Sequence, residues 1–185
     1  MELPLLVLVL VSFCEGQNWN APDFCRNKLC PQFTAGEQHQ GFEERLYVPT
    51  EWITTKIDNP KSTDFMAANS RLKRVAGDAS ADYWPVLITV TNGSVASLSW
   101  FVPPNTAKPE MTDTSVTLQS RPEVTVYVRV FDGPPSINNG KENAKMQCDA
   151  LQEAGKSCTD TYSFAGYDSY FSITHHNEVW FDKTQ

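Results

Sequence analysis

Histidine and methionine side chains are the first candidates for metal chemistry in this sequence of 185 residues. Both residue types bind iron and other transition metals. His39 lies in an N-terminal stretch without a periodic pattern, and His175 and His176 lie together in a predicted loop. Met66 and Met111 are weaker candidates, and we expect Met66 to pack in the core. Because loop histidines are usually solvent exposed, we expect His175 or His176 to be a ligand only if their loop folds over a cleft.

The N-terminus has the layout of an export signal. The apolar run Leu3–Phe13 is followed by small residues at positions −3 and −1 of a cut after Gly16. The run is shorter than the roughly 20 apolar residues that span a bilayer, and no later stretch is long and apolar enough. We therefore expect residues 1–16 to be a signal peptide. The mature protein would then be secreted, extracellular and without stable membrane insertion.

Removal of that signal leaves four cysteines. An even number of cysteines in an exported chain indicates disulfides. Four cysteines allow three pairings, and the sequence does not choose among them. We favour Cys25–Cys30 and Cys148–Cys158, because each pair is close in sequence and flanked by turn-forming residues. A zinc site is the alternative, but neither pair fits well the spacing, with histidine nearby, that zinc sites use.

Charge and motifs argue against two broad classes of function. A formal net charge of −7 is unfavourable for nucleic acid, whose binding relies on basic patches. The sequence has no G-x-S-x-G, H-E-x-x-H, P-loop or dinucleotide-binding motif. The acidic pair Glu43-Glu44 stands beside Arg45 in a predicted strand, which is more typical of solvated charges than of an acid–base device. We expect a protein that is not an enzyme.

The first part of the chain predicts a strap, a strand and a helix. Residues 17–40 have no period, and we expect an irregular strap pinned by a disulfide. Phe42–Val48 and Glu51–Ile57 are rich in aromatic and β-branched residues, which predicts one strand interrupted near Pro49. A helix capped by Ser62 or Thr63 then runs to Gly77. Its apolar stripe recurs at helical spacing and comprises Phe65, Ala68, Leu72 and Val75.

An Asn-Gly pair follows between two apolar runs. Residues 84–91 and 95–102 flank Asn92-Gly93, which is a strong signal for a β-hairpin. Asn92-Gly93-Ser94 is also an acceptor sequence for N-linked glycan. A hairpin tip is exposed, so we expect Asn92 to be glycosylated in the exported protein.

The same order of elements is then repeated. Strands are predicted at 116–118, 123–131, 161–165 and 178–181, with a helix at 138–154 after the second. Each half therefore contains a strand, a helix and two strands. One such half cannot cover its own apolar sheet face, but two halves can close on each other. We predict an α+β domain over residues 41–185, a distorted, mostly antiparallel β-barrel from two βαββ units with two helices packed outside.

Three blocks of this sequence resemble the SOUL haem-binding family, especially its haem-binding protein 2-like branch. Phe42–Tyr47 with Trp52–Thr55 is similar to the family stretch YE-R-Y … W-VST. Ser120–Gly133 is similar to RPEMTVYVRSFGG, and Tyr162–Ser169 with Asn177–Trp180 is similar to YYTAGYDSP … RNNEVW. The blocks keep their order and span residues 42–182. This resemblance implies the two-unit barrel and a non-enzymatic role in binding haem or another tetrapyrrole in a shallow apolar cleft beside the first helix.

The implied cleft can be assigned to residues of the first helix. We expect the ring to meet a set of mainly apolar residues, Phe65, Met66, Ala68, Asn69 and Leu72. The propionates would pair with a basic cluster near the end of the same helix, Arg71, Lys73 and Arg74. An apolar helical stripe is ordinarily core, so Phe65 and Leu72 have packing as an alternative role.

Two points limit what the resemblance carries over. Some relatives place a histidine beside the tyrosine of the opening block, where this chain has Leu46, so one candidate axial ligand is missing. His175 and His176 remain the possible axial ligands. The family also includes members linked to cell-death control through protein contacts. A protein-interaction module of that kind, with no physiological tetrapyrrole, is therefore the alternative function.

Overall fold

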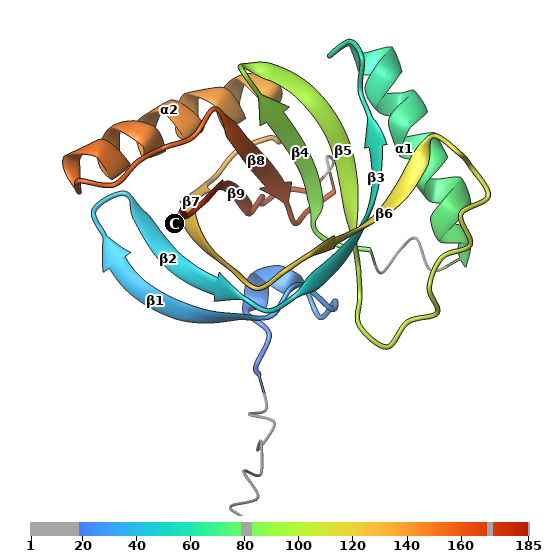
Figure 1. Ribbon diagram of the computed structural model, residues 1–185, viewed down its shortest axis with the longest axis horizontal. Coiled ribbons are helices and arrows are strands. Elements are labelled where there is room, and N and C mark those ends of the chain that lie inside the picture. The colour runs from blue at the N-terminus through green and yellow to red at the C-terminus, as the bar shows by residue number, and fades with distance from the viewer. Residues whose placement is uncertain (1–18, 79–82, 170–171, 185) are drawn as a thin grey trace, which may run out of the picture.

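The computed structural model describes residues 19–78, 83–169 and 172–184, so the predicted signal peptide at 1–16 lies outside the described residues. Within these ranges, two α-helices and nine strands form one α+β arrangement (Figure 1). In chain order the elements are η1 (Asp23–Cys25), β1 (Phe33–His39), β2 (Phe42–Tyr47), β3 (Thr50–Lys56), α1 (Ser62–Ala76), β4 (Val86–Thr91), β5 (Ser94–Val102), β6 (Val116–Arg121), β7 (Val124–Phe131), α2 (Ile137–Glu153), β8 (Thr161–Gly166) and β9 (Asn177–Asp182).

All nine strands belong to one antiparallel sheet, in the order β1-β2-β7-β9-β8-β4-β5-β3-β6. Without β1, this order is symmetrical. Exchanging β2 with β6, β3 with β7, β4 with β8 and β5 with β9 reproduces it. The repeat predicted from the pattern of elements is therefore also a repeat of strand pairing, centred between β4 and β8.

The predicted barrel is not formed. The sheet curls, as Figure 1 shows, but its edges are β1 and β6, which are not neighbours in the strand order. A closed barrel of two equal units would pair the equivalent strands β2 and β6. Strand β1 instead pairs with that side of β2, from Phe33 opposite Tyr47 to His39 opposite Phe42. This strand occupies part of the segment that we expected to be an irregular strap.

The chain crosses between the two halves at Pro49. The stretch that we predicted as one interrupted strand is two strands with different neighbours. Strand β2 lies in one half of the sheet, with β7, β9 and β8, whereas β3 lies in the other half, between β5 and β6. The hairpin signal at Asn92-Gly93 is confirmed, and both residues have positive φ angles, 50° and 74°.

Both helices lie outside the curl and bury one side against it. Helix α1 buries Ala68, Leu72 and Val75, so the predicted stripe packs on the sheet. Its N-cap is Lys61, without a side-chain cap, rather than Ser62 or Thr63. Helix α2, in contrast, has a side-chain N-cap, because the Ser136 side chain accepts a hydrogen bond from the Asn139 backbone amide at 3.1 Å.

Two hydrophobic cores occupy the two faces of the sheet. The outer core lies between sheet and helices and includes Ile53, Leu72 and Phe164. The inner core lies within the curl and includes Tyr47, Trp52 and Trp180, with η1 and its disulfide packed against them. The sheet is therefore covered on its outer face by helices and on part of its inner face by the N-terminal segment.

Candidate functional site

A cavity lies at the centre of the symmetrical arrangement, on the outer face of the sheet. Helix α1 packs mainly on β3, β5 and β6, and α2 packs mainly on β2, β7 and β9. The two middle strands, β4 and β8, therefore remain between the helices. The cavity over them measures about 430 Å³. Its lining comprises Asn69, Trp84, Val86, Ile88, Phe131, Pro135, Ser136, Phe164, Ala165, Gly166, Asp168, Ser169 and Asn177.

The floor of this cavity is apolar because of strand alternation. Val86 and Ile88 are two residues apart on β4, so both side chains point to the outer face. Phe164 is paired with Ile88 on the neighbouring strand, which puts its ring on the same face. Phe131 from β7 adds a further aromatic wall. An apolar floor with few polar groups is the usual character of a small-molecule site.

Polar groups at the cavity come from the ends of elements. Asn177 opens β9 and is a buried residue, only 3% exposed. Its amide nitrogen donates to the carbonyl oxygen of Gly133 at 2.8 Å, which ties β9 to the turn before α2. Asp168 follows β8 and accepts a hydrogen bond from the His176 backbone amide at 2.7 Å. These contacts fix the loops that form one side of the cavity.

The N-terminal segment brings two cations to the rim. Arg26 Nε lies 3.1 Å from Asp168 Oδ1, and Arg26 also donates to the Thr174 hydroxyl at 3.0 Å. Lys28 Nζ lies 4.4 Å from the centre of the Trp84 ring. Sequence reasoning missed both residues, because a segment without a period gives no indication of which part of the sheet it crosses.

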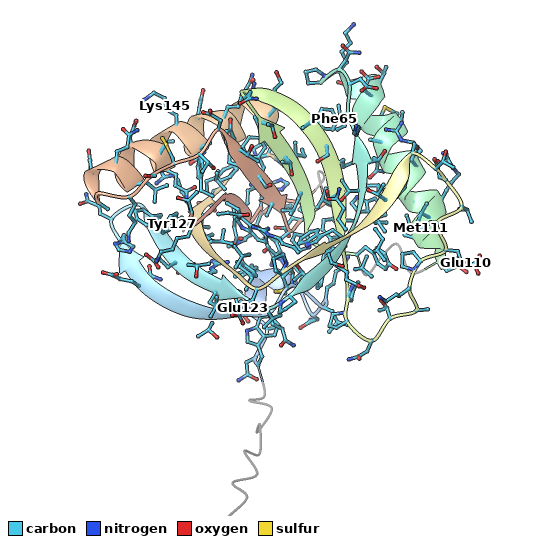
Figure 2. The ribbon with its side chains drawn as sticks, viewed as in Figure 1. Phe65, Glu110, Met111, Glu123, Tyr127 and Lys145 are labelled. Carbon is cyan, nitrogen blue, oxygen red and sulfur yellow. A yellow bond between two sulfur atoms is a disulfide. The ribbon has the colours of Figure 1, made fainter. Side chains whose placement is uncertain are left out.

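The residues predicted to line a cleft on α1 fall into three groups. Ala68 and Leu72 have no exposed surface, so they pack in the outer core and do not line a cleft. Phe65, labelled on α1 in Figure 2, is partly buried against the same core. Asn69 lines the cavity. Met66 is 70% exposed, on the same side of the helix as Asn69, rather than in the core as expected.

Two of the three predicted propionate partners are held elsewhere. Arg71 donates to the Thr55 hydroxyl and to the Lys56 carbonyl oxygen, both at 2.9 Å. Arg74 pairs with Asp113 at 2.7 Å, away from the cavity lining. Lys73 is exposed and lies one turn after Asn69, on the side of α1 that meets the cavity. Lys73 is therefore the member of the predicted cluster that is placed to serve the cavity.

A matching family model covers most of the chain. The model described as SOUL heme-binding protein matches residues 28–182. The chain belongs to the SOUL haem-binding family. Heme-binding protein 2 from Homo sapiens is 28% identical over 186 aligned residues, covering 90% of this chain and 84% of that protein. Heme-binding protein 2 from Mus musculus is 28% identical over 188 residues, with the same coverage.

Solved structures share the fold of this SOUL-family chain at low sequence identity. The crystal structure of the EcmrR C-terminal domain is similar with a TM-score of 0.54, covering 83% of this chain and 98% of that domain at 9% identity. The cryo-EM structure of an EcmrR–DNA complex is similar with a TM-score of 0.56, covering 82% of this chain and 58% of that one, also at 9% identity. These likenesses concern the fold alone.

The histidines proposed as haem ligands of this SOUL-family chain do not line the central cavity. His176 Nε2 donates to Glu178 Oε1 at 2.7 Å, and its ring stacks on Phe24 with centroids 4.1 Å apart. His175 lines a separate hollow beside the β7–α2 turn, and its Nδ1 is buried with no partner among the described residues. Met111 is 41% exposed in the loop before β6 (Figure 2).

A buried ion pair that sequence reasoning missed lies inside the curl. The Arg45 residue is 3% exposed and Glu178 is fully buried, and their side chains are 2.8 Å apart. Glu178 also accepts hydrogen bonds from His176, Tyr167 and Trp180. Four donors on one carboxylate satisfy its hydrogen-bonding capacity, so this pair is a structural junction of β2 with β9.

The surroundings shift the pKa values of this pair. Burial by itself raises the pKa of Glu178, but the hydrogen bond from His176 and the charge of Arg45 outweigh it and hold the pKa below its ordinary value. Burial by itself lowers the pKa of Arg45, and the carboxylate of Glu178 reverses that shift. Both groups are therefore charged at neutral pH.

Both disulfides have the pairing that we favoured. Cys25 is bonded to Cys30 beside η1, and Cys148 on α2 is bonded to Cys158 before β8. The four cysteines of the described residues are therefore not available as zinc ligands or nucleophiles. Within the described ranges, neither helix is long and apolar enough to cross a membrane.

Proposed function

We propose that this protein binds haem or another flat tetrapyrrole in the central cavity, as a ligand and without catalysis. Membership of a haem-binding family supports the ligand class. The observation that carries the location is the apolar outer face of β4 and β8, which lies between the two helices as the floor of a cavity of about 430 Å³. Cavities of about 300–1,000 Å³ are typical of small-molecule sites.

The proposed mode of binding is burial of the ring with weak or no iron ligation. No histidine, cysteine, methionine or tyrosine is among the described residues that line the cavity. Met66, one turn before Asn69, is the nearest soft ligand on α1. The propionates would meet cations at the rim, namely Lys73 from the predicted cluster together with Arg26 and Lys28 from the N-terminal segment.

Burial alone accounts for a moderate affinity. Apolar contact contributes about 25 cal/mol per Å² removed from water, so a ring face of a few hundred Å² supplies several kcal/mol before ordering costs. This suits a dissociation constant on the order of micromolar, about −8 kcal/mol. Iron ligation would add to that value, so the ratio of haem to metal-free porphyrin affinity measures its contribution.

We also propose that the protein acts outside the cell. Two disulfides suit an oxidising compartment. Asn92 is exposed at the β4–β5 turn, and its side chain is therefore open to glycosylation. Protein recovered from culture medium should lack residues 1–16, carry glycan on Asn92 and show no free thiol by intact-mass analysis. A free thiol or a retained N-terminal segment would contradict this location.

The same secreted protein can test the ligand. Haem and metal-free protoporphyrin are titrated against wild type by absorbance and tryptophan fluorescence. We expect both to bind in the micromolar range, within about threefold of each other. Asn69→Trp fills the cavity from an exposed position on α1 and should weaken both ligands by about tenfold or more. Ala67→Trp, an exposed position that does not line the cavity, is the matched control.

Two results would contradict the proposal. Equal effects of Asn69→Trp and Ala67→Trp would place the ligand outside the central cavity. A preference for haem of about tenfold or more, lost in His175→Ala, would make His175 an axial ligand. His176 is not used in this test, because its replacement also removes a hydrogen bond to the buried Glu178.

A further inference from the structure

A second cavity lies on the opposite, inner face of the sheet. It measures about 580 Å³ and is bordered by strands of the first half together with β8 and β9. Its lining is rich in hydroxyl groups, in contrast to the apolar central cavity on the outer face. The lining residues used below are Trp52, Thr54, Leu87, Thr89, Ser99, Arg121, Ser163, Trp180 and Asp182. We call this cavity the hydroxyl trough.

The strand register explains why the hydroxyl groups share one face. Thr54 on β3 lies opposite Thr117 on β6 and opposite Ser99 on β5. Thr89 on β4 lies opposite Ser97 on β5 and opposite Ser163 on β8. Directly opposed residues in a sheet point to the same side. The hydroxyls of these rows that line the trough therefore lie across four neighbouring strands, β3, β5, β4 and β8, about 4.8 Å apart from strand to strand.

Hydrogen bonds within these rows leave capacity for a ligand. The Thr54 hydroxyl donates to Ser99 at 2.8 Å, and the hydroxyls of Thr89 and Ser163 are 3.0 Å apart. Each hydroxyl has one hydrogen and two lone pairs. A bonded pair therefore retains one hydrogen and several lone pairs that a further molecule can use, both as donor and as acceptor.

Apolar side chains bound the hydroxyl rows on one side. The Thr54–Ser99 row continues to Leu87, and the Thr89–Ser163 row continues to Trp180, again by direct strand pairing. The indole of Trp52 packs against that of Trp180, with centroids 6.4 Å apart. The indole N–H of Trp180 is used by Glu178, so this wall offers the trough carbon surface.

The charges beside the trough cancel. Arg121 forms an ion pair with Asp182 at the rim, and its guanidinium lies 5.7 Å from the centre of the Trp180 ring. The lining of this cavity contains no other charged side chain. A trough with paired charges favours a ligand without net charge, because an anion or a cation would have to disrupt the pair.

We propose that the hydroxyl trough is a binding site for a small neutral saccharide. Such a ligand has many hydroxyl groups that both donate and accept, no net charge, and C–H surface that can contact the Leu87 and Trp180 wall. The site is separated from the central cavity by the sheet itself. A saccharide in the trough therefore does not compete with a tetrapyrrole on the outer face, and this inference does not depend on the proposed function.

The test uses the full secreted chain with both disulfides. Maltose and N,N′-diacetylchitobiose are titrated by saturation-transfer NMR and calorimetry, with glucuronic acid as the charged comparison. We expect millimolar binding of at least one neutral disaccharide and weaker binding of glucuronic acid. The double variant Thr54→Val/Thr89→Val keeps side-chain shape but removes two hydroxyls, and should weaken that binding by about tenfold or more.

Thr125→Val is the matched control, because Thr125 lies on β7 between the inward-facing Val124 and Val126 and so points to the outer face. It should leave saccharide binding unchanged. The circular dichroism spectrum and the urea unfolding transition of the double variant should show that it is folded like wild type. Three results would overturn the proposal: binding of none of the neutral saccharides, a preference for glucuronic acid, or equal losses in the double variant and the control.

Discussion

The two halves of the sheet share one topology but differ on the inner face. In the half that contains β2, β7, β9 and β8, strands β2 and β9 lie on either side of β7 and contribute the buried pair of Arg45 and Glu178. In the first half, the equivalent strands β5 and β6 contribute Ser99 and Thr117 to a solvent-accessible, hydroxyl-rich region. The difference shows that strand pairing constrains the backbone of each half, while the inward-facing residues are free to form a packed junction or a cavity.

The helices of the two halves are attached differently as well. Helix α2 has a side-chain cap from Ser136 and a disulfide at Cys148. It also approaches the sheet closely at Gly140, where an added Cβ would meet the ring of Phe164 at 2.7 Å. Helix α1 has no side-chain cap and an exposed link from Arg74 to Asp113. The central cavity therefore lies between a firmly fixed helix and one held mainly by apolar packing.

The largest expected effect comes from breaking the junction of the second half. Glu178→Gln leaves the Arg45 guanidinium buried without its main counter-charge, and removal of one partner of a buried pair costs about 3–5 kcal/mol. We expect a loss near the lower end, about 3 kcal/mol, because Glu43 still pairs with Arg45. Urea unfolding of wild type and Glu178→Gln measures the difference in the free energy of unfolding.

Glu51→Gln is the matched control in the first half. Glu51 pairs with the exposed Lys108, and pairs of that kind contribute about 0.2–1 kcal/mol.

Because the pKa of Glu178 is lowered in the folded state, its carboxylate stabilises the fold above its ordinary pKa, and that contribution is lost as the pH falls through the folded-state value. Below about pH 4.5, the free energy of unfolding of Glu178→Gln should therefore depend less on pH than that of wild type. Similar losses of unfolding free energy in Glu178→Gln and Glu51→Gln would refute the distinction between the two halves of the sheet.

An intermediate effect is expected from opening the disulfide on α2. Cys148→Ser/Cys158→Ser removes a bridge between residues ten apart, which contributes about 2–3 kcal/mol in the chain-entropy model. Hydrogen exchange should show lower protection of the backbone amides in the last turns of α2, and unchanged protection in α1. Lys145→Ala, an exposed position on the same helix (Figure 2), is the control and should have little effect. Equal loosening of both helices would show that the bridge does not act locally.

The smallest effect concerns the link that holds the end of α1. The Ser115 hydroxyl and amide, together with Arg74, lower the pKa of Asp113 to about 2. The Ser115 hydroxyl is the largest cause, so Ser115→Ala should raise that pKa further than Arg74→Ala does. NMR titration of the Asp113 carboxyl in the two variants shows which substitution raises its pKa more. The opposite order would make Arg74 the main partner of Asp113.

Much of the fold could be predicted from local signals. Apolar spacing located α1 and α2, the Asn92-Gly93 pair located a hairpin, and sequence proximity gave the disulfide pairing that the structure has. Strand β1 was missed because Phe33–His39 is mostly exposed and contains Gly36, so it lacks the alternation of a half-buried strand. The sequence around Pro49 predicts one interrupted strand rather than two strands with different neighbours, because the effect of Pro49 on long-range pairing has no local signal.

The candidate site was harder to predict than the fold. The family resemblance implied a cleft, which we assigned to residues of α1, but Leu72 is core and the neighbouring side of the helix, at Asn69, meets the cavity. Which side meets it depends on the placement of both helices over β4 and β8. Arg45 and Glu178 are far apart in sequence, and only the pairing of β2, β7 and β9 brings them together. Such contacts cannot be inferred from spacing within one segment.

The exchange of strands between the halves has a consequence for biosynthesis. The first half of the chain supplies β2 as a neighbour for β7, and the second half of the chain supplies β6 as a neighbour for β3. A nascent chain that ends after β5 therefore has β2 paired only with β1, and β3 with one side unpaired. Contacts between distant segments form slowly, and unpaired strand edges promote aggregation. The two halves must consequently fold together, after most of the chain has emerged, and not one after the other.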